Sequence, residues 1–330
     1  MEAGKTGDGA SYTPGKVAAA ERLLSQGWWN LREGEKKILE PLIAAGLSVG
    51  VNPDFSMLGL KPSLVLASTK GKASLFDVVG EDSFAFRSYY SSSLRSVMLA
   101  APPVDEGHYY QFWQSRQREG LVDEVIIHPL QEVRFLMAPL ESFNEDTLSF
   151  DFTWTELPRR RYTQAGETTS LKLPAPDTLT VLNQLQRNPM MDSLGELSAA
   201  TGVGVEACSE ASKYVIDFPV GWGFKGADGT RHSGILLYFE GLSENVFGPV
   251  RASVRDIPFS VLEAWGKDYD RYVYFAELMV PAENLSETTE FLGRVTATCA
   301  SSFSYGFYEP TYLNQFAFSK KLAENDQDSQ

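Results

Sequence analysis

DTLTVLNQLQRNPMMDSLGELSAATGVGVEACSEASKYV, from Asp177 to Val215, is the stretch that decides the fold. Its apolar residues return at intervals of three and four within three separate segments, a spacing typical of short amphipathic helices. Asp177 can cap the first helix. Asn188-Pro189 ends it, because proline has no amide hydrogen and disfavours helix in the residue before it. The stretch therefore predicts a unit of three helices.

The second and third of these helices are fixed by a start signal and a turn. Ser193 and Glu196 form a capping-box pattern, in which the serine oxygen accepts from a helical amide and the glutamate reaches back to the serine amide. Gly202 lies in a tight turn, where glycine adopts a positive φ angle at no steric cost. The third helix should therefore leave the second at a steep angle, as in a helix-turn-helix.

The run from Leu194 to Ser209 resembles the second and third helices of prokaryotic winged-helix regulators. Leu197 stands in the buried position, Gly202 at the turn and Cys208 in the apolar slot of the recognition helix. The resemblance implies a winged helix-turn-helix over residues 177–232, with double-stranded DNA as a candidate partner.

The helix in the recognition position is poor in cations. Recognition helices usually present Arg, Lys, Gln or Asn to base edges and phosphates, whereas this one offers Glu206 and Glu210 with Lys213 as its cation. Ser209 and Lys213 are its candidate DNA contacts. Two carboxylates would repel phosphate, so the loss of DNA binding by this copy stays open.

The composition is that of a globular protein with two or more domains. The chain has 330 residues, of which 43% are hydrophobic and 22% charged. No apolar run approaches the ~20 residues that cross a bilayer, and the N-terminus lacks the apolar segment of a signal peptide, so we expect a cytoplasmic protein without membrane contact. The net charge of -14 means that DNA binding would require a local basic patch.

Cysteine and histidine usage predicts neither a metal nor a cofactor. Cys208 and Cys299 fall among apolar helical positions, which favours buried small hydrophobes over a disulfide or thiol chemistry. The three histidines, His108, His128 and His232, are scattered, and no paired cysteine spacing is present.

The N-terminal segment predicts a second, diverged helical unit. Residues 1–13 are rich in Gly, Ser and Thr and are expected to be disordered. Helices are predicted over 14–29 and 32–47, the second broken or kinked near Pro41. The pattern LIAAGL, followed by a short hairpin and by LGL before a strand, resembles the recognition helix, wing and entry strand of the Lrp/AsnC family. The resemblance implies a winged-helix unit over 14–59.

Three cations lie at the start of this second predicted recognition helix. Arg32, Lys36 and Lys37 are candidate DNA contacts, because a helix N-terminus also favours phosphate. The alternative is that they form a solvated helix face.

Residues 60–157 predict a ferredoxin-like sandwich with extra strands. The segment 60–130 follows a βαββαβ order, which folds as one antiparallel sheet with two helices on one face. The sequence LSFDFTWTEL then alternates like a strand, with Phe150, Phe152 and Trp154 on one face as packing residues.

Residues 158–176 have the composition of a linker. Arg159, Arg160 and Arg161 within it are candidate phosphate contacts. The alternative is a solvated charge run, which is the commoner use of such a cluster.

Residues 233–319 repeat the ferredoxin-like order. The segment 226–229 supplies a hairpin turn where a wing is expected, just before this unit. The first helix of the unit, over 243–257, is expected to be interrupted near Gly248-Pro249. The acidic tail 320–330 is expected to be disordered.

The two halves match by landmarks, which indicates a tandem duplication. Pro102 and Pro281 each end a third strand, and Pro129 and Pro310 each end a fourth. The predicted fold class is α+β, with tandem winged-helix units that are each followed by a ferredoxin-like sandwich, the domain order of the Lrp/AsnC family. The resemblance implies pairing of sandwiches, as a homodimer or as a pseudo-dimer within one chain, and a small effector such as an amino acid.

Three functions follow from this reading. The first is a DNA-binding transcriptional regulator, which is not an enzyme. The second is a small-molecule sensor or protein-interaction module that has lost the ability to bind DNA. The third is enzymatic, since some two-module Lrp-like proteins resemble siroheme decarboxylases that use a histidine near the end of the wing, where Arg231-His232 lies here. No other catalytic constellation is evident.

Overall fold

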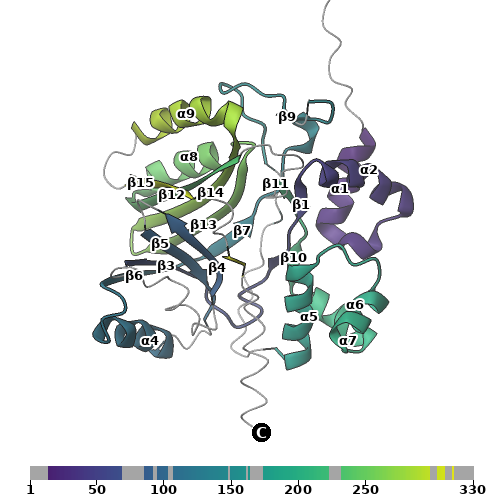
Figure 1. Ribbon diagram of the computed structural model, residues 1–330, viewed down its shortest axis with the longest axis horizontal. Coiled ribbons are helices and arrows are strands. Elements are labelled where there is room, and N and C mark those ends of the chain that lie inside the picture. Colours follow the sequence, from purple (N-terminus) through teal and green to yellow (C-terminus); the bar gives the residue numbers. More distant parts are fainter. Residues whose placement is uncertain are drawn as a thin grey trace, which may run out of the picture.

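In the computed structural model the chain forms a helical lobe beside a lobe of two stacked sheets (Figure 1). The helical lobe combines segments from the two halves of the sequence, and so does the sheet lobe. The structure describes residues 14–68, 85–91, 95–102, 107–147, 149–160, 163, 174–222, 232–297, 303–308 and 314–315. The expected disorder of 1–13 and 320–330, the first helix of the βαββαβ order expected in 60–130, and the turn at 226–229 lie outside these residues.

The three helices of the C-terminal helical unit are confirmed. They are α5 (Pro176–Arg187), α6 (Leu194–Thr201) and α7 (Val205–Ser212). Ser193 Oγ accepts from the Glu196 amide at 3.0 Å, and Gly202 ends α6 with a φ angle of 71°. The Glu196 carboxylate accepts from the amide of Asp192 at 2.7 Å, one residue earlier than the sequence predicts. The first contact satisfies an amide that the helix leaves open, and the second holds the residue before the cap.

The N-terminal helical unit keeps two α-helices, and a single 3-10 turn stands between them. The elements are α1 (Pro14–Gln26), a 3-10 helix (Trp28–Asn30) and α2 (Glu33–Ala44). The predicted break near Pro41 is absent, because α2 continues to Ala44. Proline removes one helical hydrogen bond, and burial of Leu39 and Leu42 on either side holds the helix together.

The strands that follow the helices pair between the halves, which corrects the predicted N-terminal hairpin. β1 (Leu47–Val49) pairs with β11 (Val220–Trp222), and β2 (Asn52–Pro53) pairs with β10 (Val215–Asp217), all antiparallel. Each strand has only two or three residues, too short for a stable isolated hairpin. Each strand instead finds its partner in the other half of the chain.

The first sheet has the order β16-β4-β5-β3-β6 and is antiparallel throughout. Its strands are β3 (Ser63–Ser68), β4 (Ala85–Ser91), β5 (Arg95–Ala100), β6 (Glu124–Pro129) and β16 (Asn314–Gln315), and α4 (Gly107–Arg118) lies on one face. Without β16, this is the strand order of a ferredoxin-like unit.

The second sheet has the order β15-β12-β14-β13-β7 and is also antiparallel. It consists of β12 (His232–Leu242), β13 (Ser260–Asp268), β14 (Arg271–Pro281), β15 (Phe303–Tyr308) and β7 (Glu132–Phe135), with α8 (Glu244–Arg255) and α9 (Leu285–Ala297) on one face. The interruption predicted in α8 is absent, since the helix runs through Pro249 between the buried Phe247 and Val250.

Each half adds a strand that follows its ferredoxin-like unit to the sheet of the other half. β7 follows the first unit and pairs with β13 of the second, while β16 follows the second unit and pairs with β4 of the first. The chain crosses between the sheets directly after Pro129, where Gln131 donates to the carbonyl oxygen of Trp265 at 2.8 Å. The fold is therefore α+β, with two winged-helix units and two ferredoxin-like units interlocked by strand exchange.

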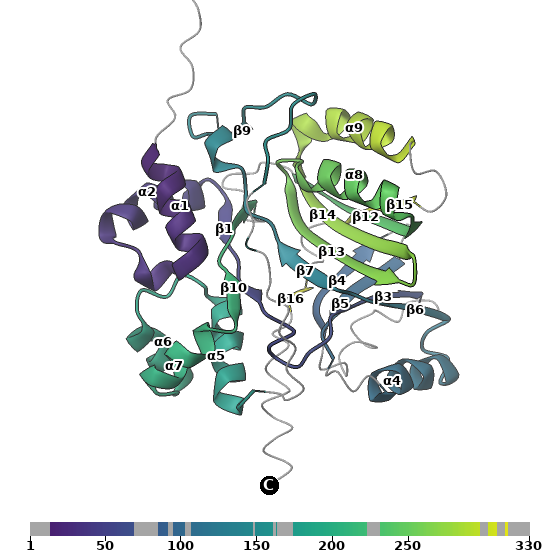
Figure 2. The same ribbon diagram turned by 180° about the vertical axis from the view of Figure 1, so that it is seen from behind.

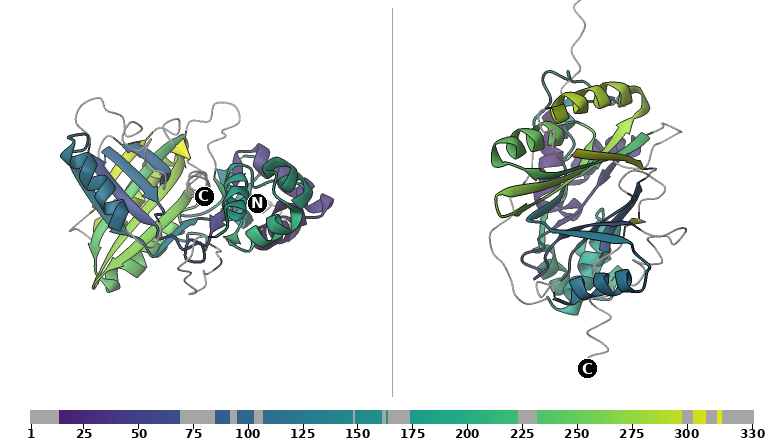
Figure 3. Two further views of the ribbon diagram at one scale, coloured as in Figure 1. Left: turned by 90° about the horizontal axis from the view of Figure 1, so that it is seen from below. Right: turned by 90° about the vertical axis from the view of Figure 1, so that its left-hand side faces the viewer.

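The two sheets stack face to face, and their helices lie outside (Figures 2 and 3). One face of the first sheet, including Leu64 and Leu99, belongs to the main core together with Leu236 and Phe275 of the second sheet. The opposite face packs with α4 in a separate core around Trp113. The interface between the sheets is therefore a joint product of both halves.

The aromatic segment that follows β7 packs as the sequence predicts, although little of it is strand. β8 (Phe143–Asn144) and β9 (Ser149–Phe150) form a two-residue ladder. Phe152 lies 5.9 Å from Phe259 between ring centroids, and Trp154 lies 5.1 Å from Phe291. Within the described ranges no helix has both the length and the apolar character to cross a membrane.

Candidate functional site

The helix α7 exposes carboxylates where a recognition helix would face DNA. Glu206, Ser209 and Glu210 are exposed. The Lys213 ammonium lies 2.6 Å from the Glu210 carboxylate, and both side chains are solvent-exposed. Across 174–222 there are two cations and six carboxylates. This half of the helical lobe is therefore acidic.

The cations of α2 are divided between solvent and a contact with the other helical unit. Arg32 and Lys37 are exposed. The Lys36 ammonium lies 2.5 Å from the carboxylate of Asp192, which precedes α6, and its side chain is only 12% exposed. Trp28 donates to the same carboxylate at 3.1 Å. Hydrogen bonds from Lys36 and Trp28 lower the pKa of Asp192, so the contact is charged at neutral pH.

The three arginines of the predicted linker do not act together. Arg159 is exposed and Arg161 lies outside the described residues. Arg160 is buried, which corrects the prediction of a solvated run, and it donates to the carbonyl oxygens of Met137, of Ile257 at 2.5 Å and of Ser260 at 3.0 Å. Burial lowers its pKa to about 9, which still leaves it charged at neutral pH. Arg160 is thus unavailable to a phosphate.

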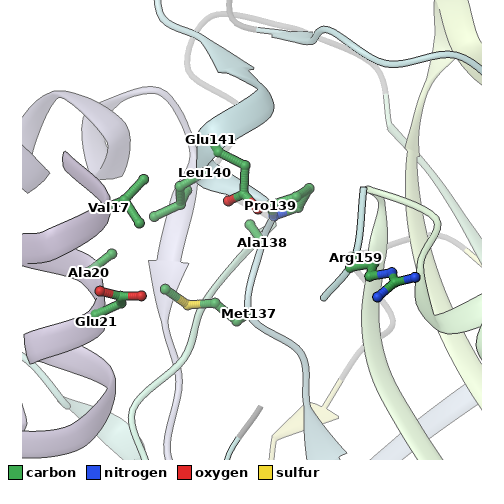
Figure 4. Close-up of a pocket in the computed structure, with 9 residues that line it drawn as sticks. All are labelled: Val17, Ala20, Glu21, Met137, Ala138, Pro139, Leu140, Glu141 and Arg159. Atoms are coloured by element: carbon green, nitrogen blue, oxygen red, sulfur yellow. The ribbon is translucent and has the colours of Figure 1, made fainter. Parts of the chain in front are cut away.

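A small cavity lies where α1 meets the segment that leaves β7 (Figure 4). Its volume is about 10 Å³, room for roughly one water molecule. The lining residues are Val17, Ala20, Glu21, Met137, Ala138, Pro139, Leu140, Glu141 and Arg159. This cavity is too small for an organic effector.

A charged cluster that the sequence reading missed lies between the two sheets. Glu277 of β14 accepts from Arg87 at 2.8 Å and from Tyr89 at 2.6 Å, both on β4, and also from Tyr308 of β15. All four side chains are buried. Burial alone would lower the pKa of Arg87, but attraction to Glu277 outweighs it and raises that pKa, while burial raises the pKa of both tyrosines. The available signal was a lone glutamate in the apolar run YVYFAELMV.

A second polar contact between the halves lies nearer the rim of the sheets. His128 of β6 and Tyr238 of β12 are 2.8 Å apart between Nε2 and the phenolic oxygen, and Tyr238 donates to Glu240 at 2.9 Å. Burial lowers the pKa of His128. Burial and the neighbouring Glu240 raise the pKa of Tyr238. Because the phenolic hydrogen of Tyr238 goes to Glu240, His128 Nε2 is the donor in this contact, and the lowered pKa favours the neutral imidazole.

A third ionic cluster fixes α8 to the exchanged strand β7. Arg251 of α8 lies 2.5 Å from Glu263 of β13 and 2.9 Å from Glu132 of β7. Trp265 also donates to Glu132 at 2.7 Å. Because these partners come from both halves, the cluster contributes to their association.

The remaining candidates of the sequence reading are a histidine and a cysteine. His232 begins β12 opposite Pro281 and is half-buried, while Arg231 lies outside the described residues. Cys208 is buried and free, and Cys299 lies outside the described residues. Among the residues that the structure describes, no group of three or more His, Cys, Asp or Glu side chains is placed to hold a metal ion.

Comparison with known proteins finds a similar fold among solved structures. No family model and no curated protein matches the chain. The crystal structure of the siroheme decarboxylase NirDL with an iron-uroporphyrin III analogue is similar with a TM-score of 0.52 and 10% identity, over 96% of this chain and 100% of that chain. A second structure of NirDL has a TM-score of 0.49 and 12% identity, over 96% and 94% of the two chains. The likeness concerns the fold, which extends over nearly the whole chain.

Proposed function

We propose that this protein is a small-molecule sensor of Lrp/AsnC-like architecture whose helical units have lost DNA recognition. The observation that carries the proposal is the excess of carboxylates in the C-terminal helical unit, where two cations stand against six carboxylates over 174–222. Of the candidate DNA contacts, Lys36 and Lys213 each pair with a carboxylate of the same chain and Arg160 is buried, while Arg32 and Lys37 are exposed. Affinity for DNA comes mainly from cations that neutralise phosphates.

The helical units then act as connectors between the halves. The pairs β1-β11 and β2-β10 and the contact of Lys36 and Trp28 with Asp192 hold them to each other. The effector, by the resemblance to the Lrp/AsnC family, is a small molecule such as an amino acid that the paired sandwiches bind. Ligand binding to the folded protein alone would raise its stability.

Filter binding of duplex DNA at increasing salt tests the loss of DNA recognition. We expect no retention of DNA at any salt concentration. The variant Glu206→Lys/Glu210→Lys is a positive control, and we expect it to bind duplex DNA with an affinity that falls as salt rises. Salt-dependent binding by the unmodified protein would overturn the proposal. In parallel, a thermal-unfolding screen with amino acids and related small anions should reveal an effector as a raised melting temperature.

A second candidate function is tetrapyrrole chemistry of the kind named for NirDL. The observation that favours it is His232, half-buried at the first position of β12 and directly after the segment where the wing is expected. Siroheme titrated into the protein should then give a shifted absorption band that the His232→Ala variant lacks. An unshifted band would remove this candidate.

A further inference from the structure

A chain of hydrogen bonds joins the two sheets near their rim. Tyr238 of β12 donates to Glu240 at 2.9 Å, and Nε2 of His128 on β6 lies 2.8 Å from the same phenolic oxygen. The phenol has a single hydrogen to donate, so Nε2 is the donor to its oxygen. The other ring nitrogen of neutral His128, Nδ1, is then an acceptor, and it has no hydrogen-bond donor among the described residues. The chain of hydrogen bonds therefore ends in an acceptor that a ligand can use.

A second carboxylate lies near this acceptor. Asp268 is exposed at the end of β13. It shares a face of β13 with Gly266, where an added Cβ atom would meet the carbonyl oxygen of Pro129 at the end of β6. Asp268 is therefore on the side of the first sheet. Its charge and the charge of Glu240 both act on the His128 ring.

Neither carboxylate has a cationic partner in the part of the chain that the structure describes. Arg271 lies opposite Asp268 in the register of β13 and β14. Its guanidinium instead donates to the carbonyl oxygen of Gly241 at 3.3 Å and lies 3.8 Å from the Asp270 carboxylate. The arrangement offers acceptors and negative charge, which suits a positively charged ligand with several hydrogen atoms to donate.

The surroundings favour an organic ammonium ion over a metal ion. Within the described ranges, no group of three or more His, Cys, Asp or Glu side chains is placed to hold a metal. Ile126 is 37% exposed and lies two residues from His128, on the same face of β6. Side chains two residues apart on a strand are separated by roughly 7 Å, which a hydrocarbon chain of about five carbons can span.

We propose that a small aliphatic amine binds at this rim, with its ammonium group at His128, Glu240 and Asp268. Its hydrocarbon chain lies against Ile126. This inference names the ligand class of the sensor proposed above and rests on that function. Tyr238 is a positioning residue, because it fixes the hydrogen of the imidazole on Nε2 and leaves Nδ1 to accept. The net charge of -14 attracts cations and repels anions, which favours the same class.

The ionisation of His128 tests the charge of the ligand. Its pKa is measured from the ring-nitrogen NMR signals, which are assigned by their loss in His128→Gln. We expect n-pentylamine, which is cationic at neutral pH, to lower this pKa, because a bound cation opposes protonation. Pentanol and pentanoate carry the same hydrocarbon chain without the positive charge and should not lower it. An unchanged pKa with the amine, or a response to pentanoate instead, would overturn the proposal.

The affinity for pentylamine, measured by NMR titration, tests the carboxylates. Glu240→Gln and Asp268→Asn each remove a charged acceptor, and we expect each to weaken binding about tenfold. The matched control is Glu290→Gln, which removes one exposed negative charge from α9 on the outer side of the second sheet and should not change the affinity. Equal weakening by all three variants would show only a general attraction of cations and would overturn the site.

Two further variants test the hydrocarbon contact and the positioning residue. Ile126→Ala should weaken the binding of pentylamine and leave that of ethylamine unchanged, since the shorter chain does not reach this side chain. Tyr238→Phe removes the acceptor of the Nε2 hydrogen, so the ring-nitrogen shifts of His128 should report a mixture of tautomers. A single Nε2–H tautomer in Tyr238→Phe would contradict the positioning role. Thermal unfolding of each variant checks that it is folded.

The amine titration and the filter-binding assay fail separately. Retention of DNA together with a normal response of His128 to pentylamine would overturn the loss of DNA recognition alone. No response of His128 in a protein that does not retain DNA would overturn the amine site alone.

Discussion

The guanidinium of Arg87 in β4 lies 2.7 Å from the carboxylate of Glu277 in β14, and both side chains are buried. The first residue belongs to one ferredoxin-like unit and the second to the other. Tyr89 and Tyr308 complete the hydrogen bonding of the carboxylate. Desolvation of two charges offsets much of their attraction, so such a pair favours correct alignment more than stability.

Removal of one partner of this pair should be strongly destabilising. Glu277→Gln leaves the Arg87 charge buried without compensation, and we expect the free energy of unfolding to fall by about 3–5 kcal/mol in urea titrations. The matched control is Glu290→Gln, which breaks the exposed pair with Arg294 and should cost less than about 1 kcal/mol. The double variant Arg87→Met/Glu277→Leu should recover part of the loss. Equal effects of the two Gln variants would contradict this account.

The crossing of the chain between the sheets should tolerate no side chain at Gly266. A Cβ atom there would lie 2.1 Å from the carbonyl oxygen of Pro129, and backbone cannot move aside as a flexible side chain does. We expect Gly266→Ala to lower the unfolding free energy by about 1–3 kcal/mol. Gly293→Ala, on α9 with no atom within 4 Å, should instead raise it by about 0.5–1 kcal/mol. In chemical denaturation the two variants should therefore change the unfolding free energy in opposite directions.

Neighbouring arginines should differ in their effects on stability. Arg160→Met removes a donor from three backbone carbonyl oxygens, and we expect a loss of about 2–4 kcal/mol. Arg159→Met changes an exposed side chain and should stay within about 0.5 kcal/mol. A similar loss in both variants would show that the carbonyl contacts of Arg160 contribute little.

Acidification should lower the stability of the folded protein through His128. Burial lowers the pKa of His128 below its ordinary value of 6.5 in the folded protein, so between these two pKa values the unfolded chain binds the proton and the folded chain does not. This histidine therefore reduces stability as the pH falls from 6.5 toward its folded pKa. The free energy of unfolding is measured against pH for the unmodified protein and for His128→Gln, and the difference between the two profiles should reveal the loss. Parallel profiles would refute it.

Local structure was predictable because its signals are local. The capping residues and Gly202 gave the three C-terminal helices, and the alternation of apolar residues gave the strand order of the described parts of both ferredoxin-like units. Neither Pro41 nor Pro249 breaks its helix, because packing on either side of each proline outweighs one lost hydrogen bond. The acidic face of α7 was also visible in the sequence.

The sequence by itself determined which segments are helices and strands and that two similar halves follow each other, since hydrophobic periodicity and turn chemistry act between near neighbours. Only the tertiary structure decided that β1, β7, β10 and β16 pair across the halves. It also decided that Arg87, Arg160 and Glu277 are buried. A strand's hydrogen-bonding partner and a charge's counterion can lie anywhere in the chain, and they are selected by the summed packing of the whole molecule.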